Sequence, residues 1–280
     1  MGFVAVIGAG ALGGATTHAL ARRERMREVR LIDPEGTIAR GKALDLSQSA
    51  PVENFSTRVT SAEAIEAAAG ADAIVIADAA ANSAEHSGEP GLALLRRIVA
   101  IADRSPIVCA GAQQRELIAR AVTELRLPTT RILGSAPMAL ESALRAIAGL
   151  AIDGSGPEIA LRVVGVPPRS AVVAWEEATV SGQPLTAEIP PHVVAGLSAR
   201  IPGLWPPGPY SLGAACARVV EALVLGTRRR FTCFIAMDAG PVRAAVSAMP
   251  VEIAKGAVRR VLEPALTRQE RTRLENALEK

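Results

Sequence analysis

Three glycines directly after an apolar run carry the first chemical signal in this chain. Residues 4–7 are apolar, Gly8, Gly10 and Gly13 follow, and Asp33 lies twenty residues after Gly13. In a strand–turn–helix unit, Gly8 permits the tight turn, Gly10 lets the backbone approach a pyrophosphate, and Gly13 allows close helix–strand packing. The N–H groups that open the following helix then attract phosphate. An acid such as Asp33, at the tip of the next strand, accepts hydrogen bonds from a ribose and repels a 2′-phosphate.

This pattern predicts a dinucleotide site that prefers NAD to NADP. A glycine-rich turn can also be a simple connection, and that structural reading is the alternative. The strand before the glycines, the helix-compatible stretch after them and the spacing of the acid favour the dinucleotide site. The predicted cofactor contacts come from Gly8, Gly10, Ala11, Leu12, Gly13 and Asp33.

Alternating strand and helix signals position this site in the first half of the chain. Such alternation predicts parallel strands joined by right-handed crossovers. Strands are expected at 57–60, 73–77 and 106–110, besides 4–7 and the strand that ends before Asp33. Helices are expected at 14–25, 36–49 (ending before Pro51), from a cap at Ser61, at 92–104 and at 115–125. Residues 82–90 are polar and predict a loop or a lid.

The pattern changes at about residue 141. An antiparallel pair is expected over 159–166 and 171–180, a helix over 211–226, a strand over 231–237, a hairpin over 242–253, and a final helix over 267–279 capped by Thr267. The predicted fold class is therefore α/β: an N-terminal Rossmann domain (1–140) with a doubly wound parallel sheet, followed by a C-terminal α+β domain (141–280).

Composition excludes several classes of function. The 280 residues are 49% hydrophobic and 21% charged, with a net charge of +3 and only 2% aromatic residues. Nucleic-acid binding is not expected, because stacking platforms are scarce. No membrane span is expected, because no uninterrupted apolar stretch reaches about 18 residues. Cys109, Cys216 and Cys233 form no CxxC pattern and predict a reducing, cytoplasmic compartment, and no metal site is predicted. The chain opens on strand-like sequence, so no signal peptide is expected.

Three segments, in order, resemble the malate/lactate dehydrogenase family. VAVIGAGALGGATTHALARRE (4–24) looks like that family's first βαβ unit, and LIDPEGTIARGKALDLSQSAPV (31–52) is similar to the segment that follows the ribose acid. PVEIAKGAVRRVLEPALTRQERTRLENAL (250–278) resembles the closing strand and helix. The resemblance implies a malate/lactate dehydrogenase-like fold, NAD, and hydride transfer to or from a 2-hydroxy acid. It also implies a homodimer or homotetramer, with the second domain serving substrate binding and oligomerisation.

The family's catalytic groups are missing at the matching positions. In the family, a His oriented by an Asp takes the alcohol proton, an Arg binds the substrate carboxylate, and a lid Arg polarises the carbonyl. Ungapped matching places the His at Pro167, the Asp at Glu141 and the substrate Arg at Leu144. The lid, residues 82–90, contains no arginine, and the Asn of the family's T-N-P turn is Gly111.

The cofactor segment departs from the family as well. The family's T-A-G falls on Ala77, Asp78 and Ala79. An acid at this place lies near the dinucleotide backbone and repels phosphate, unless it turns to solvent or is bonded elsewhere. Asp78 and Gly111 therefore predict weaker NAD binding than is usual in the family.

Two side chains are candidates for catalysis. His86 lies in the lid segment, which covers the nicotinamide in this family; a solvated loop histidine is the alternative. Glu141 is either an orienting carboxylate or a surface or capping group. His18 and His192 are expected to be packing or surface residues, and Arg169 either binds an acidic group or lies at an exposed hairpin tip.

Three hypotheses follow for the function. The first is a non-catalytic family member that keeps the fold and NAD and acts as a sensor or assembly partner. The second is an active NAD-dependent oxidoreductase on a less acidic hydroxy or oxo substrate, using His86 or Glu141. In the third, NAD binding is lost and an oligomer scaffold remains. Loss of a positioned acid–base typically lowers a rate by ~10²–10⁴, so negligible malate and lactate turnover is expected.

Overall fold

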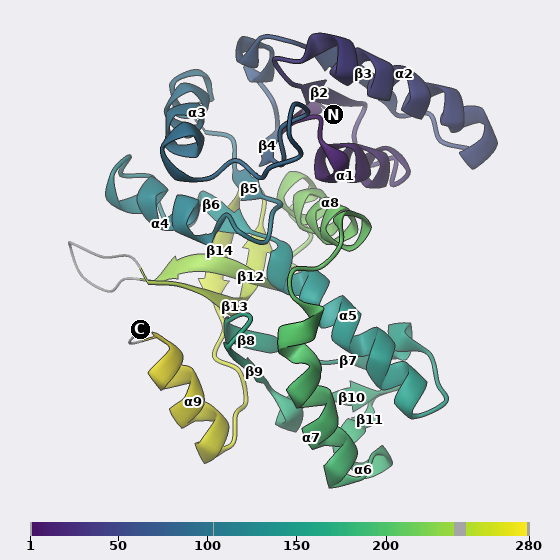
Figure 1. Cartoon of the computed structure of the whole chain (residues 1–280), viewed down its shortest axis with the longest axis vertical. Coiled ribbons are helices and arrows are strands. Elements are labelled where there is room, and N and C mark those ends of the chain that lie inside the picture. The colour runs from purple at the N-terminus through teal and green to yellow at the C-terminus, as the bar shows by residue number, and fades with distance from the viewer. Residues whose placement is uncertain (1, 103, 238–244, 279–280) are drawn as a thin grey trace.

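The computed structural model describes residues 2–102, 104–237 and 245–278. Within them, the first half forms a parallel sheet in the order β3-β2-β1-β4-β5-β6 (Figure 1). This is the strand order of a doubly wound dinucleotide-binding sheet. The strands are β1 Phe3–Ile7, β2 Glu28–Ile32, β3 Arg58–Ala62, β4 Ala73–Ile76, β5 Ile107–Cys109 and β6 Ile132–Gly134. The helices are α1 Ala11–Ala21, α2 Gly36–Glu53, α3 Gly88–Ile101, α4 Arg115–Thr123 and α5 Ala136–Ala151, with a 3₁₀ turn η1 at Ile65–Ala68.

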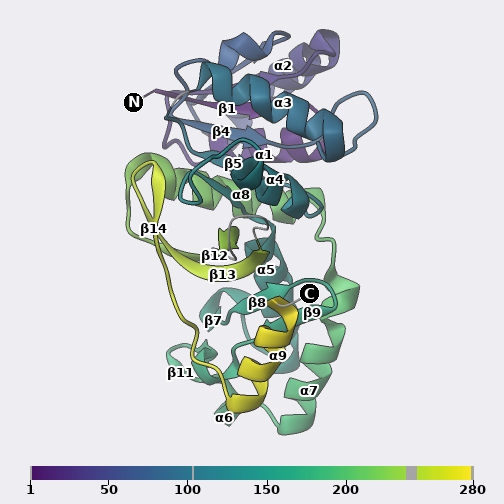
Figure 2. The same cartoon turned by 90° about the vertical axis from the view of Figure 1, so that its left-hand side faces the viewer.

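The second half is antiparallel, as expected. Its strands are β7 Ile159–Ala160, β8 Val163–Val166, β9 Ser170–Val173, β10 Thr179–Val180, β11 Gln183–Pro184, β12 Arg230–Met237, β13 Ala245–Ala254 and β14 Ala257–Val261. Its helices are α6 Leu185–Glu188, α7 Pro191–Arg200, α8 Pro209–Leu225 and α9 Arg268–Leu278, with 3₁₀ turns at Gly156–Glu158, Trp175–Glu177 and Ile201–Leu204. Strands β7, β10 and β11 form a separate small sheet. The two halves lie one above the other along the long axis (Figures 1 and 2).

The two halves share one continuous sheet. β12 pairs antiparallel with β6 through Phe234 and Gly134, and the sheet continues through β13, β8 and β9. Helix α8 of the second half packs on α1 of the first (Figures 1 and 2). The predicted boundary between 140 and 141 lies inside α5 and stays a prediction.

The central parallel strands are buried on both faces. Every residue of β4 and all but Phe3 of β1 are buried, as expected for strands covered by helices on either side. Cys109, Cys216 and Cys233 are buried free thiols in the same core. Burial raises the pKa of all three thiols, that of Cys216 to about 12, so they stay protonated and act as small core residues.

Two local predictions are wrong. Helix α2 continues past Pro51 to Glu53. A proline this close to the end of a helix removes one backbone N–H donor, and the helix can still extend for the last two residues. Asn54, in the left-handed region, closes that helix and donates its N–H to the Ala50 carbonyl. Ser61 caps no helix, since β3 runs through Ala62 and pairs with β2.

The C-terminal helix is confirmed with its cap. α9 begins at Arg268, the Glu270 N–H donates to the Thr267 hydroxyl at 3.2 Å, and the Thr267 N–H donates to the Glu270 carboxylate at 2.8 Å. This reciprocal pair is a capping box. Of the expected hairpin over 242–253, residues 242–244 lie outside the described residues; over the rest the prediction is wrong, because β13 runs through as one strand and turns into β14 only after Ala254.

Candidate functional site

The glycine turn has the geometry that the sequence predicts. Gly8 has a φ of +103°, which favours glycine, and its N–H donates to the Ile32 carbonyl at 2.8 Å. A side chain at Gly13 would overlap the Gly8 carbonyl oxygen, so α1 can approach β1 only with glycine there. Helix α1 begins at Ala11, directly after the turn, and its N-terminal N–H groups face the carboxyl edge of the sheet.

Asp33 lies beside this turn, fully buried at the end of β2. Its Oδ2 accepts hydrogen bonds from the N–H groups of Ala9 (2.8 Å) and Ala80 (3.0 Å), and its Oδ1 accepts one from Glu35 (2.9 Å). A carboxylate has about four acceptor positions. The three backbone bonds therefore fix Asp33 in place and leave one of its acceptor positions unused.

Asp78 occupies the N-terminus of α1. Its Oδ1 accepts the Gly13 N–H at 2.8 Å and its Oδ2 accepts the Leu12 N–H at 3.0 Å, and the side chain is buried. A side chain at Gly10 would overlap this carboxylate. A negative charge at a helix N-terminus is stabilised by the helix dipole and by the free N–H donors. The acid predicted to repel phosphate is thus bonded at the place where a dinucleotide phosphate would bind.

A cation borders the same turn. Lys42 of α2, which is half-buried, donates from Nζ to the Gly10 carbonyl at 2.6 Å. The sequence places Lys42 in the GKALDL helix but gives no signal that it folds back onto the glycine turn, because the contact spans 32 residues. Lys42 adds positive charge beside the α1 N-terminus.

The lid segment lies at the carboxyl edge of the sheet, against the turn that follows β5; this place, where a dinucleotide binds in a doubly wound fold, is called here the groove. Glu85 accepts the N–H groups of Ala112 (2.9 Å) and Gln113 (2.7 Å), just before α4 begins. Burial raises the pKa of the Glu85 carboxyl, those two hydrogen bonds oppose the increase, and the charge of Asp78 adds to it. Residues 78 and 85 also form an antiparallel bridge.

A buried glutamine holds the segment down. The Gln114 side chain donates from Nε2 to the carbonyls of Ala77 (3.1 Å) and His86 (3.3 Å), and its Oε1 accepts the Gly111 N–H at 2.9 Å. Glu85 and Gln114 were not predicted as site residues. Their roles depend on partners 27 to 37 residues away, so no local pattern announces them.

Gly111 provides the space for Glu85. A side chain there would overlap the Glu85 carboxylate, which is the far end of a flexible side chain. We expect Gly111→Ala to expel Glu85 and to raise the amide exchange rates of Ala112 and Gln113 by roughly tenfold, because two charge-assisted hydrogen bonds are lost. Hydrogen exchange read by mass spectrometry measures this.

The matched control for Gly111→Ala is Gly203→Ala. An added Cβ at Gly203 meets nothing within 4 Å, so exchange near α4 should stay unchanged in that variant. Equal exchange at Ala112 and Gln113 in the two variants would contradict the role given to Gly111.

His86 lies in the groove near two acids. Its N–H donates to the Ala77 carbonyl at 3.3 Å. Burial lowers the pKa of the imidazole, while the charges of Asp33 and Asp78 raise it, and burial has the larger effect. The ring is therefore mostly neutral at pH 7. Asp33 and Asp78 thus bind the glycine turn, and His86 lies close enough to both for their charges to act on its ring.

Glu141 lies apart from this group. It is buried in α5, where it accepts the Val163 N–H at 2.9 Å and the Thr232 hydroxyl, and so joins α5 to β8 and β12. Burial raises the pKa of its carboxyl to about 7. These contacts give Glu141 a structural role between three elements. A surface or capping carboxylate, the alternative considered from the sequence, does not describe it.

The remaining residues considered from the sequence are either packed in the protein or exposed on its surface. Pro167 is buried at the β8–β9 turn, Arg169 is exposed at its tip, and Leu144 is fully buried in the second core cluster. His18 binds Glu53 at 2.9 Å, and His192 is exposed on α7. In the part of the chain that the structure describes, no group of three or more His, Cys, Asp or Glu residues could bind a metal ion.

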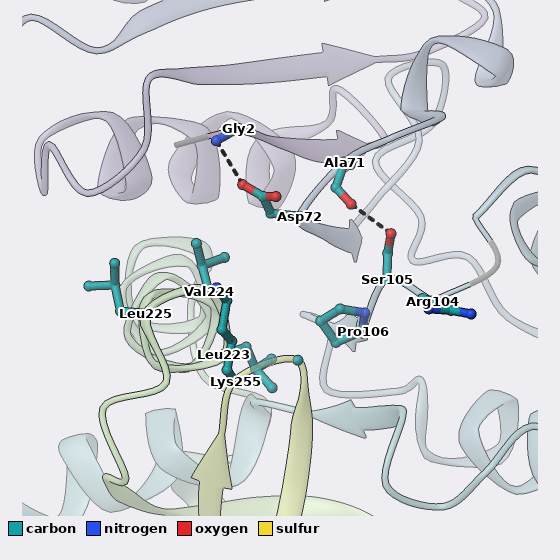
Figure 3. Close-up of a pocket in the computed structure, with 11 residues that line it drawn as sticks. Gly2, Ala71, Asp72, Arg104, Ser105, Pro106, Leu223, Val224, Leu225 and Lys255 are labelled. Atoms are coloured by element: carbon teal, nitrogen blue, oxygen red, sulfur yellow. Dashed lines mark hydrogen bonds between the residues drawn. The ribbon is translucent and has the colours of Figure 1, made fainter.

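A separate cavity of about 560 Å³ opens at the opposite, amino edge of the sheet. Asp72, which precedes β4, accepts the Gly2 N–H at 3.0 Å there, and the Ser105 hydroxyl donates to the Ala71 carbonyl at 2.6 Å (Figure 3). β4 separates Asp72 from Asp78, so this cavity and the groove lie at different edges of the sheet. Over residues 2–102, 104–237 and 245–278, we find no helix with the length and apolar character to cross a bilayer.

Comparisons with known proteins find a family model for the first part of the chain and relatives that align with nearly all of it. Residues 3–115 match the family model described as lactate/malate dehydrogenase, NAD binding domain. A malate dehydrogenase of Chloroherpeton thalassium is 27% identical, with 97% of this chain and 94% of that protein covered. An L-lactate dehydrogenase A of Rhizopus oryzae is 25% identical, with coverage of 99% and 90%.

Solved structures have the same fold. The malate dehydrogenase of Aeropyrum pernix matches with a TM-score of 0.86 at 18% identity, covering 99% of this chain and 95% of that one. That of Salinibacter ruber matches with a TM-score of 0.83 at 23% identity, covering 98% and 93%. The matched NAD-binding model supports NAD as the cofactor. Residues 3–115, which hold the glycine turn and most of the doubly wound sheet, thus match the NAD-binding domain of the lactate/malate dehydrogenases, and the whole chain has the fold of these malate dehydrogenases.

Proposed function

We propose that this chain is an NAD-binding member of the malate/lactate dehydrogenase family that does not turn over malate or lactate at an ordinary rate. The observation that carries the proposal is the β8–β9 turn, where the position matched to the family's histidine is the buried Pro167. Proline has no group that can take a proton from an alcohol. Hydride transfer from a 2-hydroxy acid needs such a base, so the chemical step lacks its proton acceptor.

Two further positions support the same conclusion. Leu144, matched to the substrate-binding arginine, packs inside the second core cluster and offers no partner to a carboxylate. Glu141, matched to the orienting aspartate, uses its carboxylate on Val163 and Thr232. The base, its orienting group and the carboxylate clamp are therefore all absent or engaged elsewhere. A role as a sensor or assembly partner fits a protein that keeps the fold without the chemistry.

NADH oxidation by the purified protein tests this proposal. With oxaloacetate or pyruvate, we expect kcat/KM at least ~10⁴-fold below that of the Chloroherpeton thalassium malate dehydrogenase on oxaloacetate, assayed beside it. Loss of the acid–base group alone accounts for ~10²–10⁴, and loss of a charged contact to substrate adds more. Saturable turnover of either 2-oxo acid within a hundredfold of the control enzyme would contradict the proposal.

A second candidate function rests on His86. This imidazole is half-buried near Asp33 and Asp78, and its pKa is lowered by burial, so a neutral base is available in the groove at pH 7. The candidate is an NAD-dependent oxidoreductase on a neutral ketone or aldehyde. The same assay with such substrates tests it, and turnover that survives His86→Ala would exclude His86 as the base.

Assembly and location remain proposals by family likeness. We propose a homodimer or homotetramer, which light scattering on the purified protein would measure directly. A cytoplasmic location is consistent with three buried free thiols, since reducing compartments keep cysteines unpaired.

A further inference from the structure

We propose that residues 78–86, called here the groove segment, occupy the dinucleotide groove from within the chain, and that Asp78 must leave the α1 N-terminus before NAD binds. The inference rests on the NAD-binding part of the proposed function. It is independent of whether any substrate is turned over. The family resemblance implies NAD as the cofactor, but an acidic side chain already occupies the place where its phosphates would bind.

The Asp78 carboxylate and the phosphates of NAD require the same backbone N–H donors. A dinucleotide pyrophosphate binds at the N-terminus of the first helix of this fold. In this chain the Leu12 and Gly13 N–H groups donate to the Asp78 carboxylate at 3.0 and 2.8 Å. The space beside Gly10, through which the backbone would approach a phosphate, is filled by the same carboxylate. NAD therefore does not fit this conformation, because two anions cannot use the same donors.

The groove segment is also attached at its other end. Glu85 binds the backbone N–H groups of Ala112 and Gln113, so a second carboxylate of the same segment occupies the turn before α4. Between the two acids, the Ala79 N–H donates to the Ala84 carbonyl at 2.9 Å, and the Ser83 N–H donates to the Ala79 carbonyl at 2.9 Å. The segment is a compact turn anchored by a carboxylate at each end.

A ligand in the same chain competes strongly with a free one. Asp78 is joined to the groove by covalent chain, so its effective concentration at the α1 N-terminus is high and constant. NAD binds only to the fraction of molecules in which Asp78 has left, and its apparent dissociation constant rises by the inverse of that fraction. The groove segment thus sets the NAD concentration at which the protein responds, as a sensor requires.

Titration with NADH, followed by its fluorescence, tests the proposal on three proteins. The unaltered chain should bind NADH weakly, and Asp78→Ala should bind it at least roughly tenfold more tightly, since the competing carboxylate is gone. Asp72→Ala is the matched control: Asp72 is an exposed aspartate at the opposite end of the same strand and binds the Gly2 N–H (Figure 3). Its affinity for NADH should equal that of the unaltered chain.

A second variant keeps the test valid if Asp78→Ala does not fold. Asp78→Asn retains the size of the side chain but loses its charge and one of its two acceptor oxygens, so it too should bind NADH more tightly. Circular dichroism establishes that each variant is folded. A folded variant whose affinity for NADH lies within twofold of the unaltered chain would overturn the proposal.

Hydrogen exchange on the unaltered protein reports the displacement itself. With saturating NADH, the amides of Ala112 and Gln113 should exchange faster, because Glu85 leaves with the segment, while those of Leu12 and Gly13 should stay protected by the bound phosphates. Unchanged or slower exchange at Ala112 and Gln113 in the NADH-bound protein would contradict displacement of the whole segment.

The outcomes separate this proposal from the proposed function. Turnover of oxaloacetate by Asp78→Ala would contradict the proposed function and leave the competition intact. Micromolar binding of NADH by the unaltered chain, with no gain in Asp78→Ala, would overturn the competition and leave the absence of turnover standing.

Discussion

Replacing Asp33 with alanine should lower the free energy of unfolding by about 3 kcal/mol or more. The carboxylate is 1% exposed and accepts three backbone N–H groups, those of Ala9, Glu35 and Ala80. A fully buried donor left without an acceptor, such as the Ala9 amide, costs about 1–3 kcal/mol, and the part-buried amides of Glu35 and Ala80 add smaller amounts. The three amides come from three separate loops, so no single neighbour can replace the lost acceptor. Urea unfolding followed by circular dichroism measures the change.

Two comparisons make this prediction specific. Asp45→Ala removes an exposed aspartate from α2 and should change stability by no more than about 0.5 kcal/mol. Asp33→Asn keeps one acceptor oxygen and should fall between the two alanine variants. A loss of less than 1 kcal/mol in Asp33→Ala would mean that the loops rearrange to satisfy their amides, and that Asp33 does not hold the glycine turn.

The glycine turn itself was predictable because its determinants are local. The apolar strand, the glycines and the start of α1 lie within residues 3–21, and each glycine answers a requirement of the turn or of the contact between β1 and α1. The parallel order of the sheet follows from the alternation of strand and helix signals. The capping box of α9 is equally local, since Thr267 and Glu270 are three residues apart.

The occupant of the groove was not predictable in the same way. The sequence marks Asp78 as an acid at a position that would repel phosphate, and it allows that the acid is bonded elsewhere. Its partners, Leu12 and Gly13, lie 66 and 65 residues away. Only the pairing of β1 with β4 brings them together. A pattern in the chain can therefore show that a cofactor site has changed, while the tertiary structure shows what took its place.

Glu141 illustrates the same limit for a single carboxylate. The sequence allows Glu141 to be an orienting group or a surface acid, because an isolated Glu on a predicted helix does not show whether it is buried. In the structure it is buried among α5, β8 and β12, and its acceptors serve Val163 and Thr232. Because the side chain fills space in the core, the informative substitution is one that removes its charge and keeps its shape.

Glu141→Gln should remove a pH dependence of stability worth about 3 kcal/mol. Burial raises the pKa of Glu141 from 4.5 to about 7 in the folded chain. Between these values the folded state holds a proton that the unfolded state has released, so the free energy of unfolding falls as the pH rises from about 4.5 to about 7. At 1.36 kcal/mol per pKa unit, the fall is about 3 kcal/mol. The neutral amide of Gln cannot ionise and should not contribute this fall.

The measurement is the difference in unfolding free energy between the two proteins across pH 4.5 to 8. Near pH 4.5 the two should have similar stability, because Glu141 is protonated and its carboxyl resembles an amide in shape. Toward pH 8 the variant should become the more stable protein, since only the unaltered chain then holds a buried charge. Glu176→Gln, at an exposed position, is the control and should follow the unaltered chain throughout. Parallel curves for Glu141→Gln and the unaltered chain would show that Glu141 ionises in the core without penalty, which its burial argues against.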